Sequence, residues 1–419
     1  MNDSTLEELE RELGPAISRS LQRASARHST IPSPLHSEFV QVRNPTRSSG
    51  RGHWRTIGLT ATAVSVIIAV AWVSVLQRAG SPTVRGAGFT SGWFLSADPQ
   101  APARRGAALV ASGEFVAVFG GVSLDGGEVI ENGLVYDTNQ DEWHLIPSVP
   151  IAGRTNLIAF SAGADMLLWG GLDADGQPAQ DGALFDPSDR TWRMLPAAPM
   201  DLHSERTVAV WTGTTMIVWG GGPGHAGAVY DLVSDSWSVT PDAPASSPDV
   251  VESHSAAWTG TEMVIWAGQT GVAYDPSSRE WRLIAKAPLS HSMPSLIWSG
   301  DEVLLLGGSL TVAGRAEGAA YDPSRDLWRP LASGPVHPGM SYAWTGESVF
   351  AAVKAIAVEY DVEQNCWREA DAAYGAQPGG VWGDGYYVVL TSIDGKDLQL
   401  ASYTPPSRPA ANSSESPCN

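Results

Sequence analysis

The chain has 419 residues, and the 43% that are hydrophobic suffice for one large domain or two ordinary ones with a sizeable core. Its formal net charge of −19 argues against nucleic acid as a partner, because phosphate binding requires clustered cations. The 44 Gly and 29 Pro indicate many turns, and 17 Trp is far above ordinary usage.

Residues 1–56 form a short and simple N-terminal segment. The pair Ser4 and Glu7 fits a helix capping box, and Gly14-Pro15 supplies a stop. We expect this segment to be partly helical and partly disordered. Its leucine stripe could dock a partner, or the helix could simply be marginal, given its length.

Residues 57–76, IGLTATAVSVIIAVAWVSVL, contain no charge. A helix of this length, at ~1.5 Å per residue, spans a ~30 Å hydrocarbon core. A cleaved signal peptide is the alternative, but the leader is 56 residues long and no A-x-A site follows Leu76. The sequence therefore predicts an uncleaved signal anchor.

The charges flanking this helix predict its orientation. Residues 1–56 hold eight Arg, whereas the other flank begins with only Arg78 and Arg85. The positive-inside rule places the N-terminus in the cytoplasm and everything after residue 77 outside the cell membrane. Only three of the 26 cations are Lys, a bias that suggests a GC-rich bacterial genome.

After a linker at 77–87, an internal repeat governs the chain. An aromatic-Asp pair recurs six times, and in every case a Trp follows the aromatic residue by seven positions. Upstream of each pair lies an apolar run such as FVAVFGG, preceded by a strand that ends in a turn such as AVWTG. The six pairs with their Trp are Tyr136-Asp137 with Trp143, Phe185-Asp186 with Trp192, Tyr230-Asp231 with Trp237, Tyr274-Asp275 with Trp281, Tyr321-Asp322 with Trp328, and Tyr360-Asp361 with Trp367.

Each unit of about 40–50 residues thus contains four short strands. The apolar run is a central strand buried on both faces, and its glycines let the backbone bend where a side chain would collide. The Asp begins a turn, and the Trp opens the fourth strand and packs between sheets. Four strands repeated around an axis make a β-propeller.

These residues resemble the kelch-repeat family, in which a diglycine, an aromatic residue and a Trp follow one another at such spacings. The resemblance covers residues 88–405 and leaves 406–419 as a disordered tail. Two units depart from the diglycine, with Ala267-Gly268 and Ala352-Val353 in its place. We expect those blades to pack slightly differently.

Two incomplete units decide the blade count. Trp93 has no preceding aromatic-Asp pair, and Tyr403 has no following Trp. Joining them makes a seventh blade in which the N-terminal strand closes a sheet begun by the C-terminus, which removes a free sheet edge. We predict an all-β, seven-bladed propeller, with six blades and an irregular segment as the alternative.

A set of cations marks the entry to the first strand in six units. We expect it to form a ring at one mouth of the channel, where it binds an acidic sugar, a carboxylate or an acidic partner. The alternative is structural, because a kelch-type Arg at this place bridges adjacent blades by hydrogen bonds. The ring consists of Arg104, Arg105, Arg154, His203, Arg206, His254, His291 and His337.

Other signals for chemistry are weak, and the sequence nominates no catalytic residue, metal site or cofactor. Asp173 to Asp181 is similar to a calcium loop but lacks a full ligand set, so a hairpin turn is expected. Galactose oxidase, which the domain resembles in architecture, needs a Cys crosslinked to a Tyr. The only propeller cysteine, Cys366, lies on an outer strand, and the spacing to Cys418 leaves open whether the two pair.

We predict a membrane-anchored, non-enzymatic module that binds a protein or a glycan and relays its occupancy through the single helix. The alternative is a carbohydrate-active enzyme of the sialic-acid epimerase or sugar oxidase kind, because Arg and His could support proton transfer. A third possibility, an anti-sigma-like regulator, rests only on topology.

Overall fold

The computed structural model describes residues 93–404 except 97–98, 147–148, 201, 203–206, 221–226, 245–253, 268–269, 289–293, 308–314, 317, 336–339, 354–355, 371–379, 384–385 and 392–396. These residues belong to the second of two compact units, Gly80–Asn419. None of them forms a helix long and apolar enough to cross a membrane. The predicted segments 1–56, 57–76, 77–87 and 406–419 lie outside the described residues.

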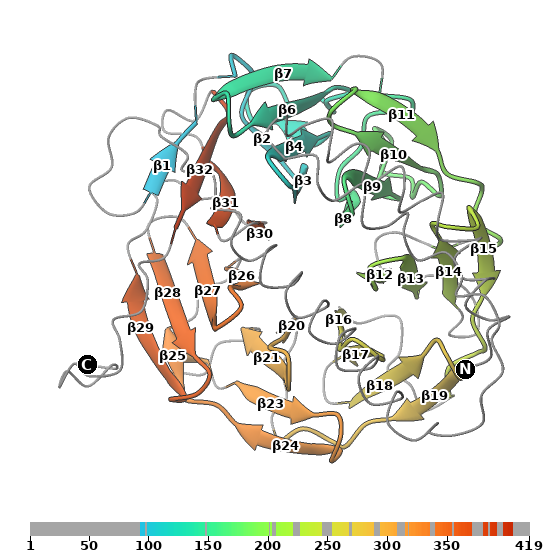
Figure 1. The fold of residues 1–419 in the computed structure, drawn as a ribbon, viewed down its shortest axis with the longest axis vertical. Helices are drawn as coiled ribbons and strands as arrows, with labels where there is room; N and C mark the ends of the chain where they lie inside the picture. The colour runs from blue at the N-terminus through green and yellow to red at the C-terminus, as the bar shows by residue number, and fades with distance from the viewer. Residues whose placement is uncertain are drawn as a thin grey trace, which may run out of the picture. The chain divides into compact units, whose positions relative to one another are not determined.

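Seven four-stranded antiparallel sheets stand around an axis, so the predicted seven-bladed β-propeller is confirmed (Figure 1). Blade 1 consists of β3 (Ala108–Ser112), β4 (Phe115–Phe119), β6 (Gly133–Asp137) and β7 (Glu142–Ile146). Blade 2 consists of β8 (Ile158–Ala162), β9 (Asp165–Trp169), β10 (Gly182–Asp186) and β11 (Thr191–Met194). Blade 3 consists of β12 (Val208–Trp211), β13 (Thr215–Trp219), β14 (Gly227–Asp231) and β15 (Ser236–Val239).

The second half of the ring repeats this order from the innermost to the outermost strand. Blade 4 consists of β16 (Ser255–Trp258), β17 (Met263–Ala267), β18 (Thr270–Asp275) and β19 (Glu280–Leu283). Blade 5 consists of β20 (Pro294–Trp298), β21 (Val303–Gly307), β23 (Ala319–Asp322) and β24 (Leu327–Pro330). Blade 6 consists of β26 (Ser341–Trp344), β27 (Ser348–Val353), β28 (Ile356–Asp361) and β29 (Cys366–Ala370).

Blade 7 joins the two ends of the propeller. It consists of β30 (Val381–Gly383), β31 (Tyr386–Thr391), β32 (Gln399–Tyr403) and, as its outermost strand, β1 (Trp93–Leu95). Trp93 is opposite Tyr403, the same pairing that joins aromatic residue and Trp in the other blades. The predicted closure by the N-terminal strand is therefore confirmed.

The seven-residue interval between aromatic and Trp has a geometric cause. The two residues are directly opposite on the third and fourth strands, and in all seven blades their ring centroids lie 4.7–5.3 Å apart. The indole nitrogen of Trp237 donates to the Pro196 carbonyl of the preceding blade, at 2.8 Å. The Trp thus joins two blades as well as two strands.

The turn between the third and fourth strands keeps the same backbone in six blades. The residue five positions after the aromatic has a positive φ of 50–60° in every one of these turns, although none of the six is a glycine. In four of them its side chain accepts a hydrogen bond from the tyrosine hydroxyl, at 2.6–2.7 Å. The six residues are Asp141, Arg190, Asp235, Arg279, Asp326 and Asn365.

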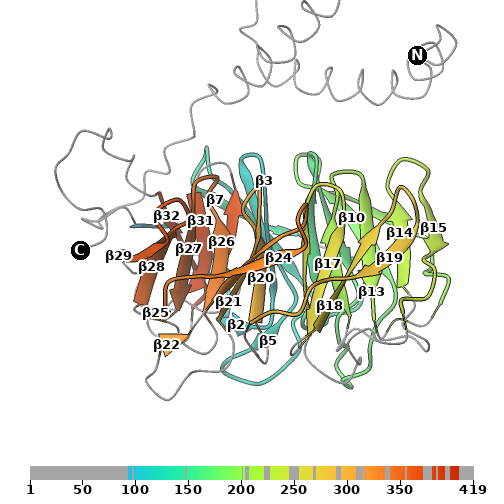
Figure 2. The same cartoon turned by 90° about the horizontal axis from the view of Figure 1, so that it is seen from below.

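The connections divide the propeller into two faces. We call turn face the side that carries the short turns between first and second and between third and fourth strands, such as 113–114 and 138–141. We call loop face the opposite side, with the connections between second and third strands, such as 120–132 and 170–181, and those between blades. The small ladders β2 (Arg104–Arg105) with β5 (Val122–Ser123) and β22 (Arg315–Ala316) with β25 (Gly334–Pro335) lie on the loop face (Figure 2).

Blades 4 and 6, which lack the diglycine, differ from the others on the loop face. Only two residues separate β17 from β18, and only two separate β27 from β28. In blades 1 and 2 the diglycine is followed by the long connections 120–132 and 170–181. Blades 4 and 6 therefore differ from blades 1 and 2 in the length of this loop, and all four of these blades keep four strands.

Candidate functional site

The predicted cationic ring lies on the connections between blades, at the loop face. Arg104 and Arg105 form β2, between the closing strand and blade 1, and Arg154 lies between blades 1 and 2. His254 immediately precedes β16 of blade 4. The other four predicted ring residues, His203, Arg206, His291 and His337, lie outside the described residues.

Arg154 is buried and bridges blades 1 and 2. Its main-chain carbonyl accepts a hydrogen bond from the Gly121 amide of blade 1, at 2.9 Å. Its guanidinium donates to the Gly170 carbonyl at 3.2 Å and to the Asp181 carboxylate at 2.5 Å, both in blade 2. The side chain therefore plays the bridging role that the sequence offered as the alternative for the ring.

The diglycines of blades 1 and 2 leave room for the segment that carries this bridge. A Cβ at Gly120 would lie 2.3 Å from the Arg154 carbonyl oxygen, and one at Gly171 would lie 2.6 Å from that of Thr155. Gly120 and Gly171 also have φ of 62° and 90°, which residues with a side chain rarely adopt. Gly120 and Gly171 thus leave space for the connection between blades 1 and 2, which contains Arg154 and Thr155.

Arg104 occupies the equivalent place between blades 7 and 1, but it has no acidic partner among the described residues. Its side chain is 1% exposed, and its guanidinium donates to the carbonyls of Gly120 and Pro102 at 3.4 and 3.5 Å. Asn132 stands immediately before β6, where Asp181 stands before β10. Burial without a carboxylate lowers the pKa of Arg104 to about 10.

The remaining described ring residues differ from these two arginines. Arg105 is exposed, because neighbouring residues of the β2 strand point in opposite directions. The half-buried His254 ring meets the Trp219 indole edge-on, with centroids 5.3 Å apart. Of the four ring residues that the structure describes, Arg105 is therefore the one that presents a cation at the surface.

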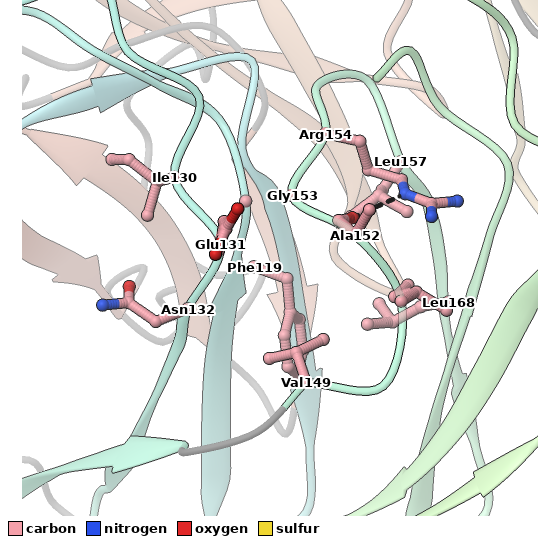
Figure 3. A pocket seen from close by; sticks show the side chains of 12 residues that line it. Phe119, Ile130, Glu131, Asn132, Val149, Ala152, Gly153, Arg154, Leu157 and Leu168 are labelled. Carbon is pink, nitrogen blue, oxygen red and sulfur yellow. Dashed lines mark hydrogen bonds between the residues drawn. The ribbon is translucent and has the colours of Figure 1, made fainter. Parts of the chain in front are cut away.

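A groove of about 470 Å³ opens on the loop face between blades 1 and 2. Glu131 and Asn132 lie on one side, and Val149, Ile151 and Gly153 lie on the other. A narrow pocket continues it inward to Phe119 and Leu168, and the Arg154 guanidinium points away from the Glu131 side (Figure 3). The groove combines an apolar wall with two polar side chains.

The Asp173 segment forms the expected hairpin turn. The Asp173 carboxylate accepts hydrogen bonds from the amides of Asp175 and Gln177, at 2.9 and 2.8 Å. The Asp173 amide donates to the Gln177 carbonyl at 2.9 Å. This carboxylate therefore shapes its own turn.

The turn face carries a network of charged side chains that the sequence did not predict. Arg282 of blade 4 binds Glu262 of its own blade at 2.6 and 2.8 Å, and donates to the Tyr321 hydroxyl of blade 5 at 2.9 Å. Bonding to Glu262 raises the pKa of Arg282, and burial raises the pKa of Tyr321. Arg193 likewise reaches Asp235 of the next blade, at 2.6 Å.

The sequence does contain a signal for this network, namely the residue that follows the fourth-strand Trp. An Arg follows the fourth-strand Trp in four units, namely Arg193, Arg282, Arg329 and Arg368. For Arg193 and Arg282 the tyrosine hydroxyl in the next blade lies 37 and 39 positions away in sequence, and one blade alone does not reveal it.

Cys366 on β29 is disulfide-bonded. The sequence has one other cysteine, Cys418, which lies outside the described residues. A sulfur engaged in a disulfide cannot also be crosslinked to a tyrosine, which leaves the sugar oxidase alternative without its cofactor-forming cysteine.

Comparisons with known proteins agree with this architecture. A family model described as the KLHDC2/KLHL20/DRC7 Kelch-repeats domain matches residues 106–308. These residues include blades 1 to 4 and the first two strands of blade 5. A search of curated proteins found no match.

Proposed function

Because this chain belongs to the kelch-repeat β-propeller family, we propose that it is a binding module whose loop face recognises a protein, or a glycan, with an acidic group. The observation that carries the proposal is the difference between two equivalent arginines. The charge of Arg154 is compensated by Asp181, whereas that of Arg104 has no described carboxylate partner.

The acidic group of the partner would bind on the loop face beside blade 1, at Arg104 and Arg105. Arg105 is exposed and can pair with it directly, and the buried charge of Arg104 adds positive potential beneath it. The chain as a whole is strongly acidic, with a formal net charge of −19. A cationic site on an acidic molecule selects both the position and the orientation of an acidic partner.

A photo-crosslinking experiment tests the loop face. A benzoylphenylalanine replaces Ser123, which is opposite Arg104 on β5 and leaves both arginines in place, in the full-length chain. In a matched control it replaces Arg325, an exposed arginine on the turn face. We expect a discrete adduct from position 123 and none from position 325 after illumination of living cells. Equal adducts from both positions, or none from position 123, contradict the proposal.

Charge exchange provides a second measurement on the same site. Arg105→Glu in a chain whose crosslinker is placed at neighbouring Ser123 is expected to abolish the adduct, and Arg105→Lys to retain most of it. An adduct that survives Arg105→Glu shows that the acidic group binds elsewhere.

We further propose that residues 57–76 anchor this module in a bacterial cell membrane, with the propeller outside and residues 1–56 in the cytoplasm. The uncharged 57–76 segment and the flanking arginines support this topology. The bonded Cys366 supports it independently, because disulfides persist in oxidising compartments. Occupancy of the loop face would then be relayed to residues 1–56 through the single helix.

Topology is tested by protease treatment of intact cells that carry an epitope tag at each terminus. We expect loss of the C-terminal tag and survival of the N-terminal one. Survival of both tags until the cells are lysed contradicts an external propeller.

A further inference from the structure

A second groove, of about 470 Å³, lies on the turn face between blades 4 and 5, far in sequence from the site proposed above. Its volume falls within the range of small-ligand sites, about 300–1,000 Å³. Turns of both blades form its walls. The lining residues are Thr259, Thr261, Glu262, Arg282, Trp298, Gly300, Asp301, Pro323 and Ser324.

Trp298 supplies the aromatic wall of this groove. It is half-buried, and it also packs against the apolar cluster between blades 4 and 5 that includes Trp266 and Val303. A Trp occupies the same register position on the innermost strand in blades 3 to 7: Trp211, Trp258, Trp298, Trp344 and Trp382. Packing holds the indole rigidly, which lowers the entropy that binding would otherwise cost.

The polar side of the groove is a planar ion pair. Glu262 accepts hydrogen bonds from Nε and Nη2 of Arg282, at 2.8 and 2.6 Å. The Tyr321 hydroxyl accepts one from Nη1 of the same guanidinium, at 2.9 Å. A two-pronged pair of this kind is fixed in orientation, and its carboxylate oxygens keep lone pairs for further donors. Hydrogen-bonding groups are thus preset along one edge of the groove.

Asp301 adds a free carboxylate at the rim. Its side chain is exposed, and no hydrogen bond or ion pair engages that carboxylate among the residues that the structure describes. Ser324, on the same rim, is already bonded to Asp322 at 2.6 Å. Asp301 is therefore the acceptor that a ligand in this groove can bind without displacing an existing contact.

We propose that this groove binds one pyranose ring of a glycan. The ring would lie with its C–H face on the Trp298 indole, donate two neighbouring hydroxyls to Asp301, and bond a third to the Glu262–Arg282 pair. An aromatic side chain and preset planar acceptors that line the same groove suit a flat molecule with C–H bonds on one face and hydroxyls around its edge.

A cationic ligand fits the groove less well. Arg282 already neutralises Glu262, and its own positive charge faces the groove. A quaternary ammonium group needs an aromatic face and an uncompensated negative environment, which Asp301 alone supplies at an exposed rim. The sugar makes use of both members of the ion pair.

The test uses the full-length chain and three immobilised trisaccharides, maltotriose, chitotriose and 3′-sialyllactose, with tetramethylammonium as the competing cation. We expect at least one trisaccharide to bind and tetramethylammonium not to displace it. Asp301→Asn changes an exposed side chain and leaves the fold intact, and it is expected to weaken binding about tenfold, as for the loss of one charge-assisted hydrogen bond. Asp189→Asn, an exposed carboxylate in a turn of blade 2 on the same face, is the matched control and is expected to leave binding unchanged.

Three outcomes overturn the inference. The first is that none of the three trisaccharides binds, and the second is that binding is equal in Asp301→Asn and the parent chain. The third is displacement of the sugar by tetramethylammonium.

Trp298→Phe, which keeps an aromatic side chain in the cluster, is expected to weaken sugar binding with little change in melting temperature. Arg105→Glu is expected to leave sugar binding intact, so failure here and failure of the loop-face proposal are distinguishable.

Discussion

Two equivalent arginines illustrate how much one neighbouring side chain changes a residue's role. Arg154 and Arg104 both reach the carbonyl of a diglycine from a buried position. Asp181 compensates the charge of Arg154, and Asn132 at the equivalent position cannot do the same for Arg104. A buried cation without a carboxylate partner costs stability.

The first prediction concerns two variants, one that removes the carboxylate beside Arg154 and one that introduces a carboxylate near Arg104. Asp181→Asn is expected to lower the free energy of unfolding by about 1.5 kcal/mol, because the buried Arg154 loses a charge-assisted partner that is itself half-exposed. Asn132→Asp is expected to raise it, since Arg104 gains a counter-ion. Urea unfolding of the two variants and the parent chain measures both, and destabilisation by Asn132→Asp contradicts the assigned equivalence.

At the scale of the element, the turn between third and fourth strands is the unit that repeats most strictly. Its left-handed residue is kept at φ of 50–60° in six blades, although its identity changes between Asp, Asn and Arg. The Asp326 carboxylate accepts hydrogen bonds from the Tyr321 hydroxyl at 2.7 Å and from the Ala285 amide of the preceding blade at 2.8 Å. The turn therefore connects blades as well as strands.

The second prediction separates backbone strain from these bonds. Arg190→Gly is expected to raise the free energy of unfolding by about 1 kcal/mol, because glycine adopts the left-handed conformation without the cost that a Cβ brings. Asp326→Gly is expected to lower it by about 1–2 kcal/mol, since the Tyr321 hydroxyl and the Ala285 amide lose their acceptor. Thermal unfolding of both variants is the measurement. Equal effects of the two changes would mean that the bonds contribute nothing.

The third prediction concerns acid. The Ser277 hydroxyl holds the pKa of the Asp275 carboxyl below its ordinary value of 3.8, and the Ser324 hydroxyl does the same for Asp322. A carboxyl whose pKa is depressed by folding contributes stability that is complete above its unfolded pKa, about 4, and is lost as the pH falls through its folded pKa. The urea midpoint should therefore be constant between pH 6 and 5 and should fall between pH 4 and 3.

Serine variants check this origin of the acid sensitivity. Ser277→Ala combined with Ser324→Ala is expected to flatten the decline between pH 4 and 3. Ser238→Ala, an exposed serine on an outer strand, is the control and should leave the decline unchanged. An unaltered pH profile in the double variant assigns the acid sensitivity to other carboxyls.

At the scale of the whole molecule, the propeller depends on one non-covalent seam. The three residues of β1 pair with β32, and Trp93 is 2% exposed among Tyr403, Phe350 and Tyr387. Every other blade obtains its four strands from one continuous stretch of chain. The ring therefore closes only when residues about 300 positions apart meet.

The fourth prediction tests this seam. Trp93→Ala is expected to lower the free energy of unfolding by about 3–5 kcal/mol, the usual cost of removing a buried Trp side chain. Trp237→Ala, the equivalent change in the uninterrupted blade 3, should cost less, because the chain still holds its fourth strand in place. Thermal unfolding compares them, and amide exchange within Gln399–Tyr403 should accelerate only in Trp93→Ala.

The architecture was predictable because its determinants are local. The aromatic-Asp pair, the turn and the Trp lie within eight residues, and the two incomplete units at Trp93 and Tyr403 complement each other. The blade number and the closure follow from these patterns alone. The roles of the cations did not follow, because Arg104 and Arg105 are neighbours in sequence and yet one is buried and the other exposed.

The sequence by itself determined the seven repeats, their strand order and the closure, since each depends on contacts within one blade or on periodicity along the chain. The tertiary structure decided which charges are compensated and where grooves open. Asp181 meets Arg154 across 27 positions, and Arg282 meets Tyr321 across 39. Such partners come together only when neighbouring blades pack against each other, and no local pattern encodes that distance.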